Sequence, residues 1–163
     1  MTKLEHIHIT VNARIDPSFK ALPREEAQRF VDRLMKAIGM KPLGPLNWAD
    51  AEDLDFPGQS FVQMITTSHC SLHFFAHKDG GNEIYFDLYS CKPFDDRLVI
   101  SLLDELFGLK EWHGVLYNRA NEGRPRVRMI GNAAMEWNTA CSTTVGKRPA
   151  LPSKEVMVAR VRN

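Results

Sequence analysis

Residues 68–91 read SHCSLHFFAHKDGGNEIYFDLYSC, and this stretch decides the fold. Residues 68–78 alternate between apolar and polar or aromatic side chains, and residues 83–90 do the same, at the period of two that is typical of β-strands. The turn residues Asp79–Asn82 separate the two runs, which predicts a β-hairpin. One face is apolar, and the other carries His69, Ser71, His73, Phe75, His77, Tyr85, Asp87, Tyr89 and Cys91.

The apolar faces of the two strands should match, and this requirement predicts a register. It pairs Phe74 with Leu88 and Ala76 with Phe86 around a three-residue turn, Gly80–Asn82.

In this register Ser71 lies opposite Cys91 and His73 lies opposite Tyr89. Cys91 and His73 are then diagonal neighbours, about 7–8 Å apart between backbones. A serine, a thiol, an imidazole and two phenols would share one face, and we interpret this face as functional.

Other segments complete the predicted fold. Strands are indicated by alternation at Leu4–Val11 and Ser60–Thr66 and, more weakly, at Trp112–Asn118. Apolar residues recur at helical spacing over residues 25–38 and 95–107, each run ending at a glycine. The order of elements predicts an α+β fold, a two-layer sandwich with a mainly antiparallel sheet and two helices on one face.

Length and charge suggest one main domain. The chain has 163 residues, 44% of them hydrophobic, which suits a single globular domain. The last forty residues, from Arg124, hold eight Lys or Arg but only Glu136 and Glu155 as acidic residues. We therefore expect a domain over residues 1–123 and a basic C-terminal extension over 124–163, packed on the acidic body or flanking it.

The composition also indicates the cellular location of the protein and which classes of partner it favours. Three cysteines without a C-x-x-C pair fit neither a disulfide framework nor a zinc knuckle and indicate a reducing, cytoplasmic location. The first residues carry no apolar leader, and no stretch is long and apolar enough to cross a membrane. The net charge of +1 does not favour a nucleic-acid partner, and only the basic extension would support one.

Histidines at 69, 73 and 77 have the spacing of a helical metal site. On a strand, however, each four-residue step spans about 13 Å, so no metal site is expected here. A thiol beside an imidazole can act as a nucleophile or as a proton donor. The predicted proximity of Cys91 and His73 therefore leaves both roles open for the thiol.

The run Thr67-Ser68-His69-Cys70-Ser71-Leu72-His73, followed by Asp87-Leu88-Tyr89-Ser90-Cys91, resembles the core of the bacterial and archaeal S-adenosylmethionine decarboxylase family. That family's pattern is roughly E-S-H-x-x-x-H, a hairpin, then D-V-F-T-C. Phe56-Pro57-Gly58-Gln59-Ser60 is similar to its F-x-P-x-G-x-S/T segment, and the resemblance spans Leu4 to Arg119.

The resemblance implies a self-processing proenzyme with a pyruvoyl cofactor. The Ser68 hydroxyl would attack the carbonyl of Thr67, and elimination would leave a pyruvoyl group on residue 68 and a separate chain 1–67. Ser60 and His73 would assist this cleavage, and Cys91 would return a proton to the substrate carbon. The pyruvoyl ketone would form a Schiff base with the substrate amine and accept the electron pair that decarboxylation leaves.

The resemblance further implies a homodimer that decarboxylates S-adenosylmethionine for spermidine, and so polyamine, biosynthesis. His69, Asp87, Tyr89 and Glu83 are candidate substrate-binding residues. His77 stands where the family commonly has the glutamate that binds the substrate ribose. Two alternatives stay open: the same chemistry on arginine or ornithine, and an uncleaved homologue that binds an adenosyl ligand or regulates a partner.

Overall fold

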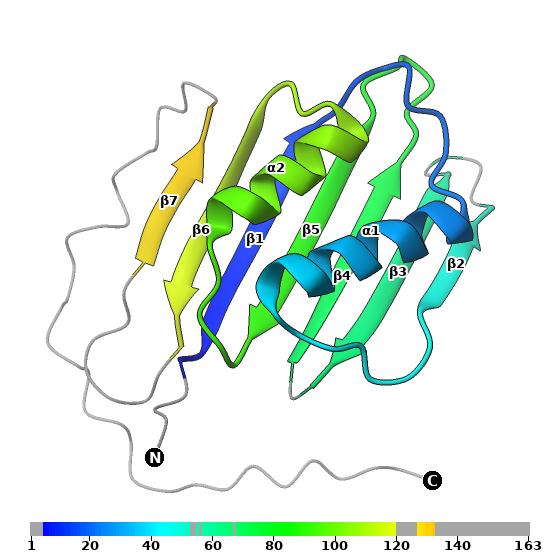
Figure 1. The fold of residues 1–163 in the computed structure, drawn as a ribbon. Coiled ribbons are helices and arrows are strands. Elements are labelled where there is room, and N and C mark those ends of the chain that lie inside the picture. Colours follow the sequence, from blue (N-terminus) through cyan, green and yellow to red (C-terminus); the bar gives the residue numbers. More distant parts are fainter. Residues whose placement is uncertain (1–4, 53–54, 56, 67, 120–126, 133–163) are drawn as a thin grey trace, which may run out of the picture. The chain divides into compact units, whose positions relative to one another are not determined.

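The computed structural model describes residues 5–52, 55, 57–66, 68–119 and 127–132. Within them, two helices cover one face of a seven-stranded sheet (Figure 1). The elements are β1 (Ile7–Arg14), α1 (Arg24–Ile38), β2 (Asn47–Ala51), β3 (Gly58–Ile65), β4 (Ser68–Phe75), β5 (Glu83–Ser90), α2 (Asp96–Phe107), β6 (Trp112–Asn118) and β7 (Val127–Gly131). The strand pairs are antiparallel, so the expected α+β two-layer sandwich is confirmed.

Both helices begin and end where their sequences indicate. The Asp95 carboxylate accepts a hydrogen bond from the Arg97 backbone N–H and caps the start of α2. Gly39 and Gly108 end α1 and α2 in the left-handed conformation, which glycine adopts without steric cost. The apolar stripe of α1 is buried and consists of Ala27, Phe30, Val31, Leu34, Met35 and Ile38.

The core lies between the helices and the sheet. The ring of Phe30 from α1 packs on Phe61 of β3 and Phe86 of β5, with centroids 6.1 Å away in each case. Every second residue of the central strands is buried in this layer, including Ile9, Val11, Leu72, Phe74, Ile84 and Leu88. The intervening residues therefore point to the opposite side of the sheet, which we call the open face.

The strand order is β2-β3-β4-β5-β1-β6-β7, which places the first strand of the chain between β5 and β6. In β1, His8 lies opposite Tyr89 of β5 on one side and Tyr117 of β6 on the other. Polar residues from three distant parts of the sequence thus become neighbours on the open face.

The predicted register of β4 and β5 is wrong by four residues. Leu72, not Ala76, pairs with Phe86, and His73 lies opposite Tyr85 rather than Tyr89. The connection is longer because Asn82 anchors it: its side chain accepts from the His77 N–H and donates to the Phe19 carbonyl. An even shift leaves the same residues on each face, so alternation could not reveal it.

Part of the expected C-terminal extension belongs to the sheet. β7 lies beyond residue 123 and pairs with β6, with Met129 opposite Val115. Residues 120–126 and 133–163, which make up most of the expected extension, lie outside the described residues.

Candidate functional site

The open face carries the polar side chains that the sequence singled out. Those predicted on the paired strands do lie there, and β1, β3 and β6 add others next to them. Cys91 and His77 were predicted on this face too, but they lie beyond the ends of β5 and β4, and Cys91 is buried at the core. Going from β3 to β6, they are Ser60, His69, Ser71, His73, Glu83, Tyr85, Asp87, Tyr89, His8, Thr10 and Tyr117. The structure divides them into separate groups.

The first group is a serine–histidine pair. Ser60 lies opposite His73 on adjacent strands, and the Ser60 Oγ is 2.8 Å from Nδ1 of His73. The ring of Phe75 stacks on His73 with a centroid distance of 6.4 Å. A hydroxyl bonded to an imidazole can pass a proton to it or take one from it, so this pair is able to act in acid–base chemistry.

The second group lies at the start of β4. The Ser68 Oγ accepts a hydrogen bond of 3.0 Å from the Cys91 backbone N–H, and the Cys91 thiol donates to the Thr66 carbonyl at 3.8 Å. Cys91 is only 7% exposed. The thiol is therefore held against the segment that contains the expected cleavage site, although Thr67 itself is outside the described residues.

These two groups are apart, which corrects the expected proximity of Cys91 and His73. His73 is five residues beyond Ser68 on β4, a distance of roughly 16 Å along a strand. Because the register differs, His69, not His73, lies opposite Tyr89 and nearest Cys91 in the sheet. Within one chain, Ser60 and His73 form one pair and Ser68 and Cys91 form another.

A third group is centred on Asp87. The His8 Nε2 is 2.7 Å from Asp87 Oδ2, and the hydroxyl of Tyr117 is 2.5 Å from His8 Nδ1. The other carboxylate oxygen, Oδ1, is buried and has no hydrogen-bond partner among the residues that the structure describes, and the His69 Nε2 lies 3.6 Å from it. Sequence reasoning did not identify His8 and Tyr117 as part of this group, because their strands meet β5 only through the non-local strand order.

Tyr89 lies beside this group. Its hydroxyl is 2.6 Å from His6 Nδ1, and the guanidinium of Arg119 lies 4.9 Å from the centre of its ring. The positive charge over the ring face is a cation–π contact.

Glu83 stands at the other end of β5, opposite Phe75. It accepts a hydrogen bond of 3.1 Å from the Tyr85 hydroxyl, and the His77 Nε2 lies 3.6 Å away. Proximity to this carboxylate and partial burial raise the pKa of Tyr85, with burial the larger cause. A carboxylate therefore lies next to His77, the position at which the family resemblance leads one to expect a glutamate.

Cys70 is not part of these groups. Its side chain is in the core, and burial together with the charge of Asp87 raises the pKa of its thiol to about 12. Cys70 thus stays protonated and unreactive. Among the residues that the structure describes, no cluster of three or more histidine, cysteine or acidic side chains is placed to hold a metal ion. In the same part of the chain, no helix is long and apolar enough to span a membrane.

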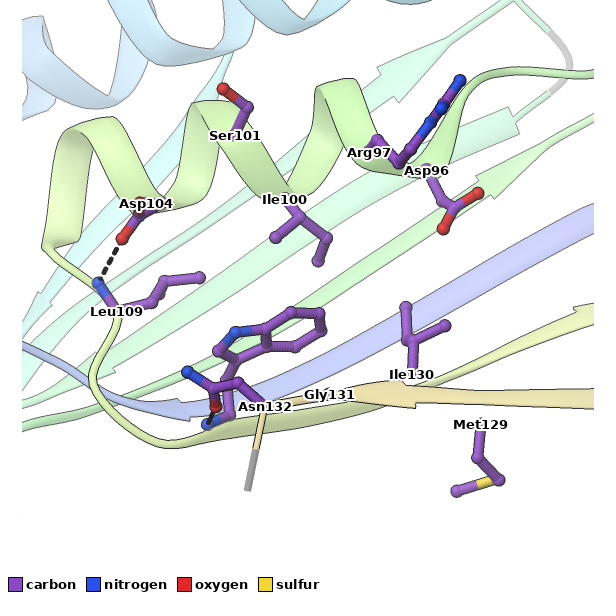
Figure 2. Close-up of a pocket in the computed structure, with 11 residues that line it drawn as sticks. Asp96, Arg97, Ile100, Ser101, Asp104, Leu109, Met129, Ile130, Gly131 and Asn132 are labelled. Carbon is purple, nitrogen blue, oxygen red and sulfur yellow. Dashed lines mark hydrogen bonds between the residues drawn. The ribbon is translucent and has the colours of Figure 1, made fainter. Parts of the chain in front are cut away.

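A cavity of about 620 Å³ lies elsewhere, between α2 and strands β6 and β7 (Figure 2). Its carboxylates already have partners: Asp104 accepts from the Leu109 N–H, and Asp96 pairs with Arg128 at 2.7 Å. The lining residues are Asp96, Arg97, Ile100, Ser101, Asp104, Leu109, Trp112, Met129, Ile130, Gly131 and Asn132. None of the groups described above borders this cavity.

Comparison with known proteins relates the chain to one family. A sequence model of the S-adenosylmethionine decarboxylase family matches residues 8–120, most of the chain. The fold is similar to a crystal structure of the adenosylmethionine decarboxylase from Aquifex aeolicus, with a TM-score of 0.56 and 15% sequence identity over 77% of this chain and 100% of that chain. No curated protein matches the sequence. The chain belongs to the S-adenosylmethionine decarboxylase family.

Proposed function

We propose that this protein is a self-processing, pyruvoyl-dependent decarboxylase of S-adenosylmethionine that acts in spermidine biosynthesis. The observation that carries the proposal is the contact between Ser68 and Cys91, whose backbone N–H donates to the Ser68 Oγ at 3.0 Å. The serine to be converted and the thiol that would act on the substrate are thereby held together at one strand end.

Self-cleavage requires no reactant besides the chain and one water molecule. The Ser68 Oγ attacks the Thr67 carbonyl carbon, and the peptide C–N bond gives way to an ester. Elimination across Cα and Cβ of residue 68 breaks the ester and releases Thr67 as a free carboxylate. Addition of water and loss of ammonia then leave the pyruvoyl group on the chain 68–163.

The residues present fit this group. Ser68 is the first residue of β4, so its backbone N lies at a strand end rather than inside the sheet, and its Oγ accepts from the Cys91 backbone N–H. When formed, the pyruvoyl group supplies an electron sink for decarboxylation. The Cys91 side chain is the proton donor to the substrate carbon, because its thiol is the acidic group at this strand end.

Ser60 and His73 assist cleavage only if they come from a second copy of the chain. In one chain the pair is roughly 16 Å from Ser68, too far for proton transfer. We therefore propose a homodimer joined through the open face. This face exposes large apolar side chains on β3 and β7, a feature typical of interaction surfaces: Val62, Met64, Val127 and Met129.

Glu83 of the second copy is the proposed acceptor for the distal part of the substrate, because it lies opposite Phe75, at the same end of the sheet as His73. A carboxylate can bind the two hydroxyls of a ribose, and it can equally bind the guanidinium of arginine or the ammonium of ornithine. The Phe75 and Tyr85 rings beside Glu83, with centroids 5.6 Å apart, also favour a cation. Decarboxylation of arginine or ornithine is therefore the second candidate function.

The test begins with the purified full-length chain, whose intact mass is followed during incubation. We expect two fragments, 1–67 and 68–163, the second lighter than a serine-initiated chain by one ammonia. Ser68→Ala is the matched control and should remain a single chain of 18.6 kDa. A wild-type chain that stays uncut would refute the proposal and favour an uncleaved homologue that binds an adenosyl ligand or regulates a partner.

The substrate is then identified by release of carbon dioxide from each of the three amino acids. Release from S-adenosylmethionine supports the first candidate, and release from arginine or ornithine supports the second. Glu83→Gln should raise KM more than it lowers kcat, because the carboxylate binds a part of the substrate that does not react.

A further inference from the structure

A chain of four polar side chains crosses the open face and ends beside the proposed cleavage site. It runs from Tyr117 on β6 through His8 on β1 and Asp87 on β5 to His69 on β4. Each of the four belongs to a different strand of the sheet, and these strands are adjacent in space. His69 directly follows Ser68 in the sequence.

The hydrogen bonds in this chain have one consistent direction when the histidines are neutral. The Asp87 carboxylate can only accept, so the proton of a neutral His8 ring is on Nε2, which donates to Asp87 Oδ2 at 2.7 Å. The His8 Nδ1 then carries a lone pair and accepts from the Tyr117 hydroxyl, 2.5 Å away. Because His8 is only 9% exposed, water does not compete freely for these bonds.

This arrangement leaves one oxygen of Asp87 in need of a donor. Oδ1 is buried and has no hydrogen-bond partner among the described residues. A buried carboxylate oxygen without a donor is unfavourable, because it has lost its hydrogen bonds to water and gained none in return. Besides His8, which is bonded to Oδ2, the Nε2 of His69 lies 3.6 Å from this oxygen, slightly beyond hydrogen-bond length and within reach of a small rotation of the ring.

Among the described residues packed around His69, no carboxylate other than Asp87 is placed to bind its ring. On β5, Tyr89 lies opposite it with a ring distance of 5.7 Å, and the Tyr89 hydroxyl is bonded to His6. The Arg119 guanidinium lies over the Tyr89 ring, and Met64 on β3 faces His69 from the other side. Within the described residues, Asp87 is the acidic group that an ion pair joins to His69.

We propose that Asp87, oriented by His8 and Tyr117, is a positioning residue that holds the proton of His69 on Nε2. The Nδ1 of His69 is then left with its lone pair, as an acceptor on the open face one residue after Ser68. A carboxylate that fixes the tautomer and the orientation of a histidine is a recurrent device in active sites. A role of His69 in catalysis depends on the proposed function. The position of the proton on its ring does not depend on that function and can be tested separately.

The tautomer is measured directly by the side-chain ¹⁵N chemical shifts of His69 in full-length protein carrying Ser68→Ala, so that cleavage cannot interfere. We expect the Nε2–H form to dominate. Adding Asp87→Asn should reduce the ratio of Nε2–H to Nδ1–H at least severalfold. Adding His8→Gln, whose amide keeps a donor toward Asp87, should retain most of the preference that His8→Ala loses.

The same substitutions in the chain that retains Ser68 test whether the orientation of His69 affects the rate of self-cleavage. Asp87→Asn and His8→Ala should slow self-cleavage about tenfold or more, in line with the loss of other carboxylate–histidine contacts, and His8→Gln should restore part of the rate. His113→Gln is the matched control, because this open-face histidine contacts Asn12 rather than Asp87. Thermal unfolding of each variant establishes that it is folded.

Two results would overturn the proposal: a dominant Nδ1–H form of His69 in the parent protein, or a tautomer ratio that Asp87→Asn and His8→Ala leave unchanged in folded protein. If Asp87→Asn does not fold, the comparison of His8→Gln with His8→Ala decides the matter. A chain that never cleaves but shows the Asp87-dependent tautomer refutes the proposed function and supports this positioning role.

Discussion

Ser60 Oγ and His73 Nδ1 are 2.8 Å apart on facing positions of β3 and β4, and the strand that holds His73 also holds Ser68. A strand is rigid over this length, so no side-chain rotation brings the pair to Ser68 of the same chain. The serine that would be cleaved and the groups that would assist it can meet only between two copies. Several consequences of the fold and the site can be measured.

The first prediction is complementation between copies. His73→Ala alone should remain uncut, and Ser68→Ala alone should remain uncut. When the two variants are expressed together, chains carrying His73→Ala should be cleaved, because the Ser68→Ala copy supplies an intact Ser60–His73 pair. Mass spectrometry of the mixture identifies which chain is cut.

The control for this experiment is a partner chain with both substitutions, which should rescue nothing. Cleavage of His73→Ala by itself would show that His73 is not required. Failure of the mixture to cleave, with dimers present by light scattering, would contradict action between copies.

The second prediction assigns different roles to the backbone N–H and to the thiol of Cys91. Its backbone N–H contacts Ser68, and its thiol is the proposed proton donor. Cys91→Ala keeps the backbone contact and removes the thiol, so self-cleavage should continue. Carbon dioxide release by the cleaved enzyme should fall by about 10²–10⁴, the usual contribution of a general acid. An equal loss of both reactions would contradict this division of roles.

The third prediction concerns Gly58, where β3 passes close to β4. A Cβ at this position would lie 1.9 Å from the Phe74 carbonyl oxygen, so the backbone would have to move. Gly58→Ala should lower the free energy of unfolding by about 2–4 kcal/mol, measured by urea denaturation. Gly81→Ala is the matched control: its Cβ meets only the Asp79 side chain, at 3.2 Å, and stability should change little.

The fourth prediction is a pH dependence of stability at Asp16. Hydrogen bonds from Lys110, the larger effect, and from Ser18 hold the pKa of the Asp16 carboxyl far below its usual value of 3.8. A carboxyl whose pKa is lower in the folded state stabilises it above the unfolded-state pKa, and the stabilisation is lost as the pH falls through the folded-state pKa.

Asp16→Asn should therefore unfold at lower urea concentration than wild type near pH 7, and the two midpoints should converge below about pH 4. Raising the salt concentration should also reduce the difference, since the 2.9 Å pair with Lys110 is on the surface. A difference that stays constant between pH 7 and pH 2 would exclude this origin.

Alternation along the strands was enough to predict which side chains share a face. His69, Ser71 and His73 on β4, and Tyr85, Asp87 and Tyr89 on β5, all lie on the open face as alternation predicts, because side chains of a strand point to opposite sides in turn. Apolar spacing likewise identified α1 and α2, because a helix buries a stripe with a period of about 3.6 residues.

Which of these residues contact one another depends on the tertiary fold. The register of β4 and β5 depends on Asn82, whose amide bonds to His77 and Phe19, and an alternating pattern is unchanged by any even shift. The contact of His8 with Asp87 depends on β1 lying between β5 and β6. Such long-range pairing is set by the packing of the whole core against the helices, and no local stretch of sequence contains it.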